Sequence, residues 1–572
     1  MLRSTRKDVC DCDRNRTLGV TRRGVRVAAA CSLAAVLAAG CGDEDNAAPS
    51  AMVTTITETT VSVPGGVPPA NPTSGTATPL DLNRAYAEAY QLASVSDQEV
   101  TRVLILVPGF QGGAGDFRYL AQRVVARTNG RTVVWAVDRR SNALEDQTGL
   151  DAAEAGRDAD IAKDYYFHQK SIRGGTFAGF LDSSANKTDI SFMSEWGIKT
   201  HIEDIDALIQ EADRRYAHVP IFLGGHSLGG AIVPIYAAWD FGGRAGFERL
   251  SGLLLFEGTP QPAAAGTTPD QVQYETTGFS GGIGAPTSLQ KLRTGDPLSS
   301  IPFVTRDLFV TSEILAMRAS RRLGDLTALN PDADLNRSFF HLLFGLRNIP
   351  PTTNRAALAF GFDKHYQPLA FTRVSLGEAI GPVGPNPNAA LFASTLGVDP
   401  TSLLAPISPN ATYDWQPSSA SHPAPTDLDT FAEALFAGPS DFIEWYFPAR
   451  LTLDVGITSS LNVQSSGDWR NDAYGMAVTE NARVDVPVFA VAGGDGLVVD
   501  ARNFDPYRDS ISTTLRSGSA RSATAAGFEA FTEPGYAHLD VLTAADSGTA
   551  DSEFGRLVSW MNDAVALAPP PR

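Results

Sequence analysis

Residues 219–230 read Val219-Pro-Ile-Phe-Leu-Gly-Gly-His-Ser-Leu-Gly-Gly230, an apolar run that leads into a glycine-rich turn around Ser227. The run is typical of a buried strand, and the residues after the turn favour a helix. In a sharp strand-to-helix turn the flanking positions must be small, and Gly225, Gly229 and Gly230 meet that requirement. Such a turn lifts the serine hydroxyl above the sheet. The stretch therefore predicts a reactive Ser227, and the alternative is an idle serine in a glycine-rich turn.

Short apolar runs alternate with amphipathic stretches on both sides of this turn. Residues 202–209 place their apolar side chains on one helical face, and residues 554–565 show the same spacing near the C-terminus. This alternation predicts an α/β fold with a mostly parallel sheet covered on both faces. The predicted strands are Val103–Val107, Val133–Val137, Val219–Leu223, Gly252–Phe256 and Val486–Ala492.

The alternation stops between residues 263 and 484, where glycine- and proline-rich loops separate helix-like pieces. We interpret 263–484 as a large, mainly helical cap inserted before the penultimate strand of a core formed by residues 81–262 and 485–572. Residues 41–80 are rich in Thr, Pro and Gly and predict a flexible linker. Their alternating part, residues 52–63, could instead form an edge strand.

The N-terminal 40 residues have the organisation of a signal peptide, because a basic segment is followed by an apolar run and small residues. Leu37-Ala-Ala-Gly-Cys41 resembles the lipobox of bacterial lipoproteins, which implies lipidation of Cys41. We expect an exported protein of the bacterial cell envelope, attached to the membrane through this N-terminal lipid anchor. The alternative is an ordinary signal peptide cut near Ala39, which would give a secreted or periplasmic protein.

Composition narrows the possible partners. The formal net charge is -18, and no basic stripe with interleaved aromatic residues is present, so we expect no nucleic-acid binding. All four cysteines lie within the first 41 residues, which excludes a disulfide framework for the rest of the chain. No zinc, calcium or phosphate-loop pattern is present, and we expect no metal and no cofactor. The sequence does not predict an oligomeric state.

The Gly225–Gly229 motif in its strand-to-helix context resembles the α/β-hydrolase superfamily, in particular its serine esterases and lipases. The resemblance covers residues 95–262 and 485–572, and it implies a chain order of serine, acid and histidine. A serine hydroxyl needs a base to remove its proton. His538, in Gly535-Tyr-Ala-His-Leu-Asp540, is the only histidine after the cap and is the predicted base. Asp540 is expected to brace this loop.

Two carboxylates compete for the role of the acid that orients the histidine. Asp495 follows the strand 486–492, and Gly493–Val498 resembles the Gly-x-Asp-x-x-Val turn that carries the acid in this superfamily. Asp495 is therefore the first choice. Glu257 ends the strand 252–256, where some members of the superfamily carry the acid, and it is the alternative.

Two backbone N–H groups are predicted to stabilise the oxyanion of acyl transfer. Leu228 follows Ser227 directly. Phe110 lies in Val107-Pro-Gly-Phe110, which resembles the His-Gly-x turn of the superfamily with Pro108 in place of its histidine. Arg139 and Arg140, followed by Glu145 and Asp146, predict an ion-pairing cluster near the mouth of the site.

The resemblance implies hydrolysis of carboxylic esters through an acyl-enzyme on Ser227. The apolar stretches 338–345 and 443–448 predict a pocket for a bulky acyl or alkyl group of a small-molecule or lipid ester, or else packing within the cap. An acyltransferase or a peptidase would use the same three residues. A non-catalytic binding protein on a hydrolase fold is the alternative from another class.

Overall fold

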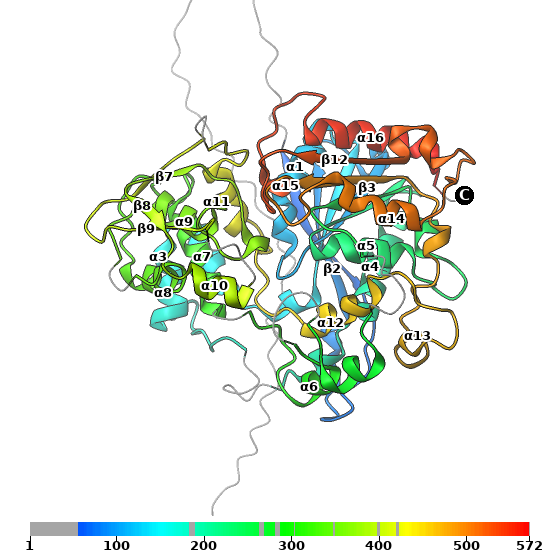
Figure 1. Cartoon of the computed structure of the whole chain (residues 1–572), viewed down its shortest axis with the longest axis horizontal. Coiled ribbons are helices and arrows are strands. Elements are labelled where there is room, and N and C mark those ends of the chain that lie inside the picture. The colour runs from blue at the N-terminus through cyan, green and yellow to red at the C-terminus, as the bar shows by residue number, and fades with distance from the viewer. Residues whose placement is uncertain are drawn as a thin grey trace, which may run out of the picture. The chain divides into compact units, whose positions relative to one another are not determined.

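A central eight-stranded sheet organises the computed structural model, which describes residues 55–181, 189–261, 268–280, 286–301, 304–346, 349–396, 401–418 and 422–570 (Figure 1). Its strands are β1 (Ile56–Pro64), β2 (Arg84–Leu92), β3 (Arg102–Val107), β4 (Thr132–Asp138), β5 (Ile221–His226), β6 (Gly252–Phe256), β11 (Val488–Gly493) and β12 (Phe528–Glu533). They lie in the order β1-β2-β4-β3-β5-β6-β11-β12. The pairs β1–β2 and β2–β4 are antiparallel, and the other pairs are parallel. The five predicted strands are β3, β4, β5, β6 and β11.

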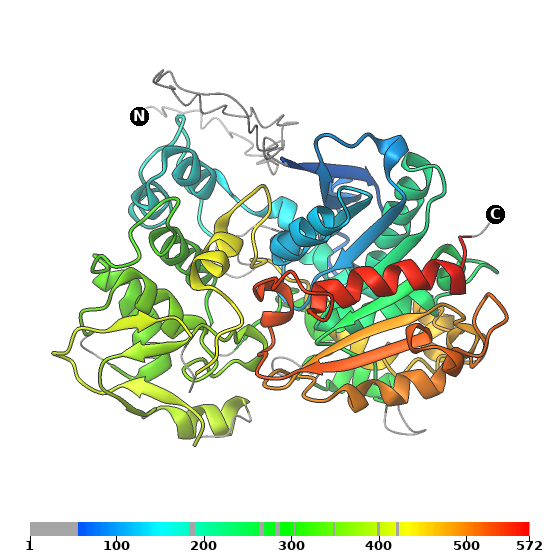
Figure 2. The same cartoon turned by 90° about the horizontal axis from the view of Figure 1, so that it is seen from above.

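Helices cover both faces of this sheet, which explains why its central strands are apolar throughout. On one face α1 (Arg118–Arg127) and α16 (Glu553–Leu567) share an apolar cluster with the sheet residues Leu104, Phe222 and Leu254 (Figure 2). On the other face α4 (Ile198–Arg215) and α5 (Leu228–Ala237) pack against Val103, Ile105 and Leu253. This arrangement confirms the predicted α/β-hydrolase fold.

The central part of the predicted linker belongs to the sheet. Residues 56–64 form β1 at its edge, as the alternative for residues 52–63 predicted. Farther along, the buried amide of Asn71 donates to the carbonyl oxygens of Ser191 and Arg293, which fixes the segment after β1 on the core. The predicted signal peptide, Cys41 and the remaining linker residues up to 54 lie outside the described residues.

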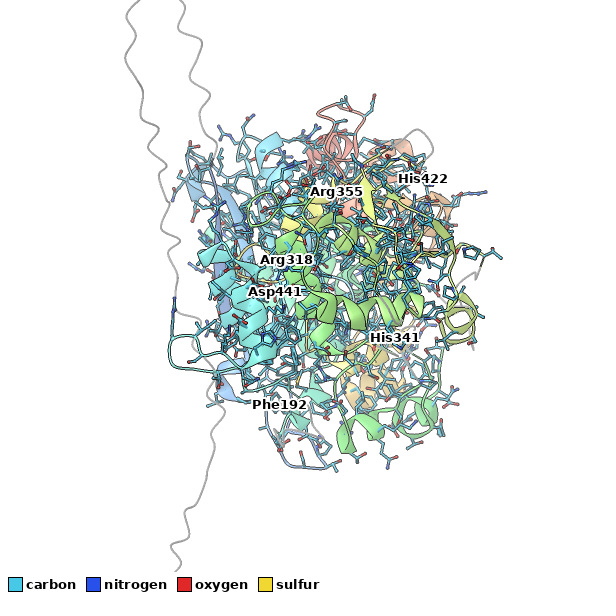
Figure 3. The ribbon with its side chains drawn as sticks, turned by 90° about the vertical axis from the view of Figure 1, so that its left-hand side faces the viewer. Phe192, Arg318, His341, Arg355, His422 and Asp441 are labelled. Atoms are coloured by element: carbon cyan, nitrogen blue, oxygen red, sulfur yellow. The ribbon has the colours of Figure 1, made fainter. Side chains whose placement is uncertain are left out.

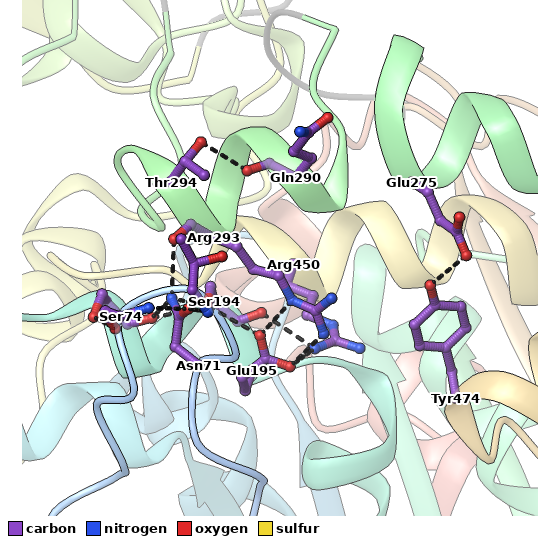
Figure 4. A network of polar contacts seen from close by, with 12 residues as sticks. Asn71, Ser74, Ser194, Glu195, Glu275, Gln290, Arg293, Thr294, Arg450 and Tyr474 are labelled. Atoms are coloured by element: carbon purple, nitrogen blue, oxygen red, sulfur yellow. Dashed lines mark hydrogen bonds and ion pairs between the residues drawn. The ribbon is translucent and has the colours of Figure 1, made fainter.

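A buried ion network continues from Asn71 into the interior. Glu195 accepts from Arg293 Nε at 2.7 Å and from Arg450 Nη1 at 2.5 Å, so that it lies between the two arginines (Figure 4). Arg450 belongs to α12 (Ala449–Thr458) and also pairs with Asp454 of the same helix at 3.5 Å. The network therefore joins α12 to the N-terminal segment.

The cap has its own apolar cluster, and it draws on two segments of the chain. Its helices are α7 (Arg306–Arg318), α8 (Ala333–Phe344), α9 (Asn354–Phe362), α10 (Ala389–Leu396) and α11 (Leu428–Phe436). Two small sheets accompany them, one pairing β7 (Glu378–Ile380) with β10 (Asp414–Gln416), the other β8 (Val383–Pro385) with β9 (Leu404–Pro406). The cluster also takes in Leu150 and Tyr165 of α2 (Thr148–Gly156) and α3 (Ala159–His168).

Ion pairs hold α3 within the cap. Arg318, which is labelled in Figure 3, lies at the end of α7. It donates to Asp160 of α3 at 2.7 Å. In contrast, α6 (Leu289–Thr294) and α12 pack on the apolar cluster of the core. The packing thus divides the chain differently from the predicted boundaries at 263 and 484, because α2 and α3 precede the serine turn in sequence but lie with the cap. In the described part of the chain, no helix is both long and apolar enough to cross a bilayer.

Candidate active site

Ser227 occupies a strained turn between β5 and α5. Its φ is 56° and its ψ is -119°, a conformation that non-glycine residues rarely adopt. Close backbone contacts require the glycines around it. A Cβ on Gly229 would lie 2.1 Å from the Val107 oxygen, and one on Gly258 would lie 1.9 Å from the Ser227 oxygen. Ser227 lines a cavity of the protein.

His538 lies in the loop after β12 and lines the same cavity as Ser227. Its Nδ1 is 3.0 Å from Oε2 of Glu257, and both side chains are almost completely buried. An imidazole whose Nδ1–H donates to a carboxylate keeps Nε2 as its acceptor. Burial lowers the pKa of His538 to about 3, so the ring is neutral at physiological pH.

Glu257 is held in place by backbone groups of the turn after β11. Its Oε1 accepts from Gly493 N–H at 2.5 Å, and its Oε2 accepts from Leu497 N–H at 2.6 Å and Val498 N–H at 3.3 Å. Burial raises the pKa of the Glu257 carboxyl, and the three N–H donors act in the opposite direction. A Cβ on Gly496 would lie 2.1 Å from Oε2, so this turn has room only for a glycine there.

The structure corrects the choice between the two carboxylates. Asp495 does not contact His538; its Oδ2 accepts from Lys364 Nζ of the cap at 2.6 Å, and half of its side chain is exposed. The physical reason is that the Gly493–Val498 turn directs backbone N–H groups, and not its carboxylate, toward the imidazole side. Glu257 therefore takes the position beside His538 that was predicted for Asp495.

Asp540 braces the histidine loop, as predicted. Its buried carboxylate accepts from Ala537 N–H at 2.6 Å within the loop. It also accepts from Ser375 N–H at 3.1 Å and Thr426 Oγ1–H at 2.6 Å, which both belong to the cap. The loop that carries His538 is thus bonded to the cap as well as to the core.

His226 packs against His538 and does not take its place. The ring centroids are 4.5 Å apart, and Nε2 of His226 lies 3.0 Å from the carbonyl oxygen of His538. Burial, and secondarily the neighbouring His538, lower the pKa of His226 to about 3. It is therefore a neutral donor that fixes the backbone of the histidine loop.

The two predicted oxyanion donors lie beside the serine. Leu228 is the first residue of α5, where a helical N–H has no acceptor within the helix. Phe110 lines the cavity, and within the described residues its N–H donates to no protein group. The preceding Gly109 is close to the serine, since a Cβ on it would lie 3.3 Å from Ser227 Oγ. Both N–H groups are therefore available near Ser227.

Side chains of the cap make the cavity largely apolar. Phe110 and Ile443 line it together with Ser227 and His538. The cap contributes Leu308, Phe309, Leu342, Phe362, Phe392 and Phe442. No cluster of three or more His, Cys, Asp or Glu side chains able to hold a metal occurs among the residues that the structure describes.

No protein-family model matches the chain, and no curated protein matches it. Several solved structures are similar to it. A peroxisomal alpha-beta-hydrolase from Saccharomyces cerevisiae is 10% identical over 90% of this chain and 92% of its own, with a TM-score of 0.37. A lipase in an open form is 14% identical over 89% and 99%, with a TM-score of 0.32.

A soluble variant of monoglyceride lipase, also from Saccharomyces cerevisiae, is 14% identical over 84% of this chain and 92% of its own, with a TM-score of 0.30. These TM-scores are low. The fold is therefore assigned from the strand order and the serine turn of this chain, and its chemistry from the side chains described above.

Proposed function

We propose that the protein is a serine hydrolase that cleaves carboxylic esters through an acyl-enzyme on Ser227. The observation that carries the proposal is the contact between His538 Nδ1 and Glu257 Oε2. Ser227, in its strained turn, lines the same cavity as His538. In this proposal Ser227 is the nucleophile, His538 the base and Glu257 the acid. Asp495 has no part in it.

The first half of the reaction forms the acyl-enzyme. Nε2 of His538 takes the hydroxyl proton while Ser227 Oγ attacks the ester carbonyl carbon, and the carbonyl oxygen becomes an oxyanion. The N–H groups of Phe110 and Leu228 stabilise this oxyanion. Glu257 stabilises the imidazolium and fixes its tautomer. The carbonyl re-forms, the bond to the alcohol oxygen breaks, and His538 returns its proton to the leaving alkoxide.

The second half releases the acid. A water molecule gives a proton to His538 Nε2 and attacks the acyl carbon, and the resulting oxyanion meets the same two N–H groups. Ser227 Oγ leaves and takes the proton back from His538. The products are a carboxylic acid and the free enzyme.

The cavity supports an ester with an apolar acyl or alkyl group as the substrate. Its lining from the cap is aromatic and aliphatic, and such walls bind hydrocarbon through burial of apolar surface. The stretches 338–345 and 443–448 contribute Leu342, Leu343 and Ile443 to this lining. The sequence also supports export with lipidation at Cys41, which radiolabelled palmitate incorporation into wild type and Cys41→Ala would test.

The experiment that tests the proposal is hydrolysis of p-nitrophenyl esters of graded chain length by wild type and Ser227→Ala. We expect turnover by wild type that falls by about 10⁶-fold in the variant, with the seryl label of a fluorophosphonate probe on Ser227 by mass spectrometry. Absence of turnover on every ester, or turnover that survives the substitution, would contradict the proposal. Transfer of the acyl group to an added alcohol in preference to water would identify an acyltransferase.

A further inference from the structure

Arg139 lies directly behind the loop that carries Phe110. It follows β4 and is only 3% exposed. Its Nη2–H groups donate to the carbonyl oxygens of Pro108 at 2.5 Å and Gly109 at 2.7 Å, and its Nη1 donates to the carbonyl oxygen of Gly112 at 2.7 Å. One guanidinium therefore holds three carbonyl groups of the loop 108–112.

A buried partner fixes the guanidinium itself. Glu444 Oε2 accepts from Arg139 Nη1 at 2.7 Å, and the hydroxyl of Ser141 donates to the other carboxylate oxygen. The guanidinium also lies over the ring of Phe447, 4.9 Å from its centroid. Because a charge buried in this way is costly unless it is paired, the arginine has one strongly preferred position.

Residues 442–444, the segment that carries Glu444, are also bonded to the loop 108–112 through their backbone. Glu444 N–H donates to the carbonyl oxygen of Gln111 at 2.8 Å, and Gly113 N–H donates to that of Phe442 at 3.0 Å. Residues Gly112 and Ile443 form an antiparallel bridge between these contacts. Thus the loop is held by side-chain and backbone bonds on the side of Arg139 and Glu444.

The geometry of one peptide bond connects this clamp to catalysis. The carbonyl of Gly109 and the N–H of Phe110 belong to the same planar trans peptide, so they point in opposite directions. When Arg139 holds the Gly109 oxygen, the Phe110 N–H must point away from the guanidinium. That N–H has no protein acceptor among the described residues, and Phe110 lines the cavity beside Ser227.

We propose that Arg139 is a positioning residue that sets the direction of the Phe110 N–H toward the oxyanion, with Glu444 as its counter-charge. The inference rests on the proposed function, because it assigns a role within the same acyl transfer. Arg139 touches neither the substrate nor the reacting atoms in this role. It acts through the peptide that it holds.

The neighbouring Arg140 offers a matched control. It is equally buried and also pairs with a carboxylate, since its Nε donates to Asp204 Oδ2 at 2.9 Å. Its Nη2 donates to the other oxygen of Asp204, and its remaining hydrogen bonds go to Gly66 and Asn83, and not to the loop 108–112. Removal of either guanidinium costs a buried ion pair, but of the two arginines only Arg139 bonds to the peptide that carries the Phe110 N–H.

The experiment compares Arg139→Lys and Arg139→Met with Arg140→Met. For each variant, kcat and KM are measured on a p-nitrophenyl ester, together with thermal stability and the affinity for a trifluoromethyl ketone, whose adduct with serine carries an oxyanion. Removal of a whole oxyanion donor lowers kcat by about 10²- to 10³-fold, so we expect a misdirected donor to lower it by about 10- to 100-fold. KM should stay within about threefold, and the ketone affinity should fall in proportion to kcat.

Arg140→Met should lower the melting temperature but keep kcat and the ketone affinity. In a third variant, Arg139→Ala, added guanidinium ion should restore part of kcat and of the ketone affinity together. Wild-type kcat and ketone affinity in Arg139→Met would overturn the inference and leave the proposed function standing, whereas an inactive, unlabelled wild type would overturn the proposed function. If the Arg139 variants do not fold, Glu444→Gln is measured instead. It should lower kcat and the ketone affinity together, and wild-type values of both would overturn the inference.

Discussion

Two neighbouring strands of the sheet, β6 and β11, each end near a carboxylate, and the two carboxylates have opposite surroundings. Glu257, after β6, is buried, accepts three backbone N–H groups and contacts His538. Asp495, after β11, is half exposed and pairs with Lys364 of the cap. The difference teaches that the turn after β11 supplies backbone donors to the site, while the carboxylate comes from the adjacent strand.

The comparison is tested most directly by replacing each of the two carboxylates by an amide. Only the substitution at Glu257 should lower kcat strongly. Glu257→Gln replaces one carboxylate oxygen by an amide NH₂ donor, which permits the wrong tautomer of His538, so we expect kcat to fall by about 10³- to 10⁴-fold. Asp495→Asn should leave kcat within about threefold of wild type. Steady-state kinetics on one ester measure both. If Asp495→Asn lowered kcat more than Glu257→Gln does, Asp495 and not Glu257 would be the acid.

A smaller effect should follow from crowding the turn that holds Glu257. In Gly496→Ala the new methyl group would lie 2.1 Å from Glu257 Oε2, so the turn or the carboxylate must move. Misplacement of about 1 Å costs on the order of 100-fold in rate, and we expect a loss of kcat of about 10- to 100-fold. Gly494→Ala is the control, since its methyl group would meet no atom closer than 3.3 Å. Equal losses in the two variants would show that the turn matters only for folding.

The pH dependence of activity and of stability should report on the two buried histidines, His226 and His538. Because burial lowers the pKa of His538 to about 3, the acidic limb of the kcat/KM profile should lie below the ordinary histidine pKa of about 6.5. The unfolded chain binds the proton first, so His226 and His538 should both cost stability as the pH falls from about 6.5 to 3. The free energy of unfolding of His226→Gln should therefore depend less steeply on pH in this range. An acidic limb at 6.5 or above would contradict the assignment of a buried base.

The smallest effect should come from the pair at the exposed carboxylate. Lys364→Met removes the bonds to Asp495 and to the carbonyl oxygen of Gly535. Partly exposed ion pairs contribute about 0.2–1 kcal/mol, so we expect a loss of unfolding free energy in this range by urea denaturation. A loss above about 2 kcal/mol would mean that this contact is a major link between cap and core.

The sequence was sufficient for the strands that are apolar throughout and for the serine turn, because burial on both faces and close backbone contacts leave direct marks on residue type. It predicted β1 only as an alternative to a flexible linker, and it did not predict β2. The first is rich in Thr, and the second alternates Ala with Tyr and Glu, so neither has an apolar run.

Which carboxylate contacts His538 depends on how the turns after β6 and β11 are oriented. The spacing of residues in the sequence does not determine that orientation. Gly258 after Glu257 was a usable signal, since it is required by contact with the Ser227 backbone. Likewise the prediction of an ion-pairing cluster around Arg139 described its chemistry but not its partners, because Glu444 is more than 300 residues away along the chain.

The bonds that Asp540 makes to the cap have a consequence for how a substrate enters. Ser375 and Thr426 hold this carboxylate, and the carbonyl oxygen of Arg373 accepts from Leu539 N–H at 2.9 Å, next to His538. A cap that swings outward must break these bonds. The loop would then keep its bonds to Glu257 and His226 of the core, and closing of the cap over a substrate would restore the full support of His538.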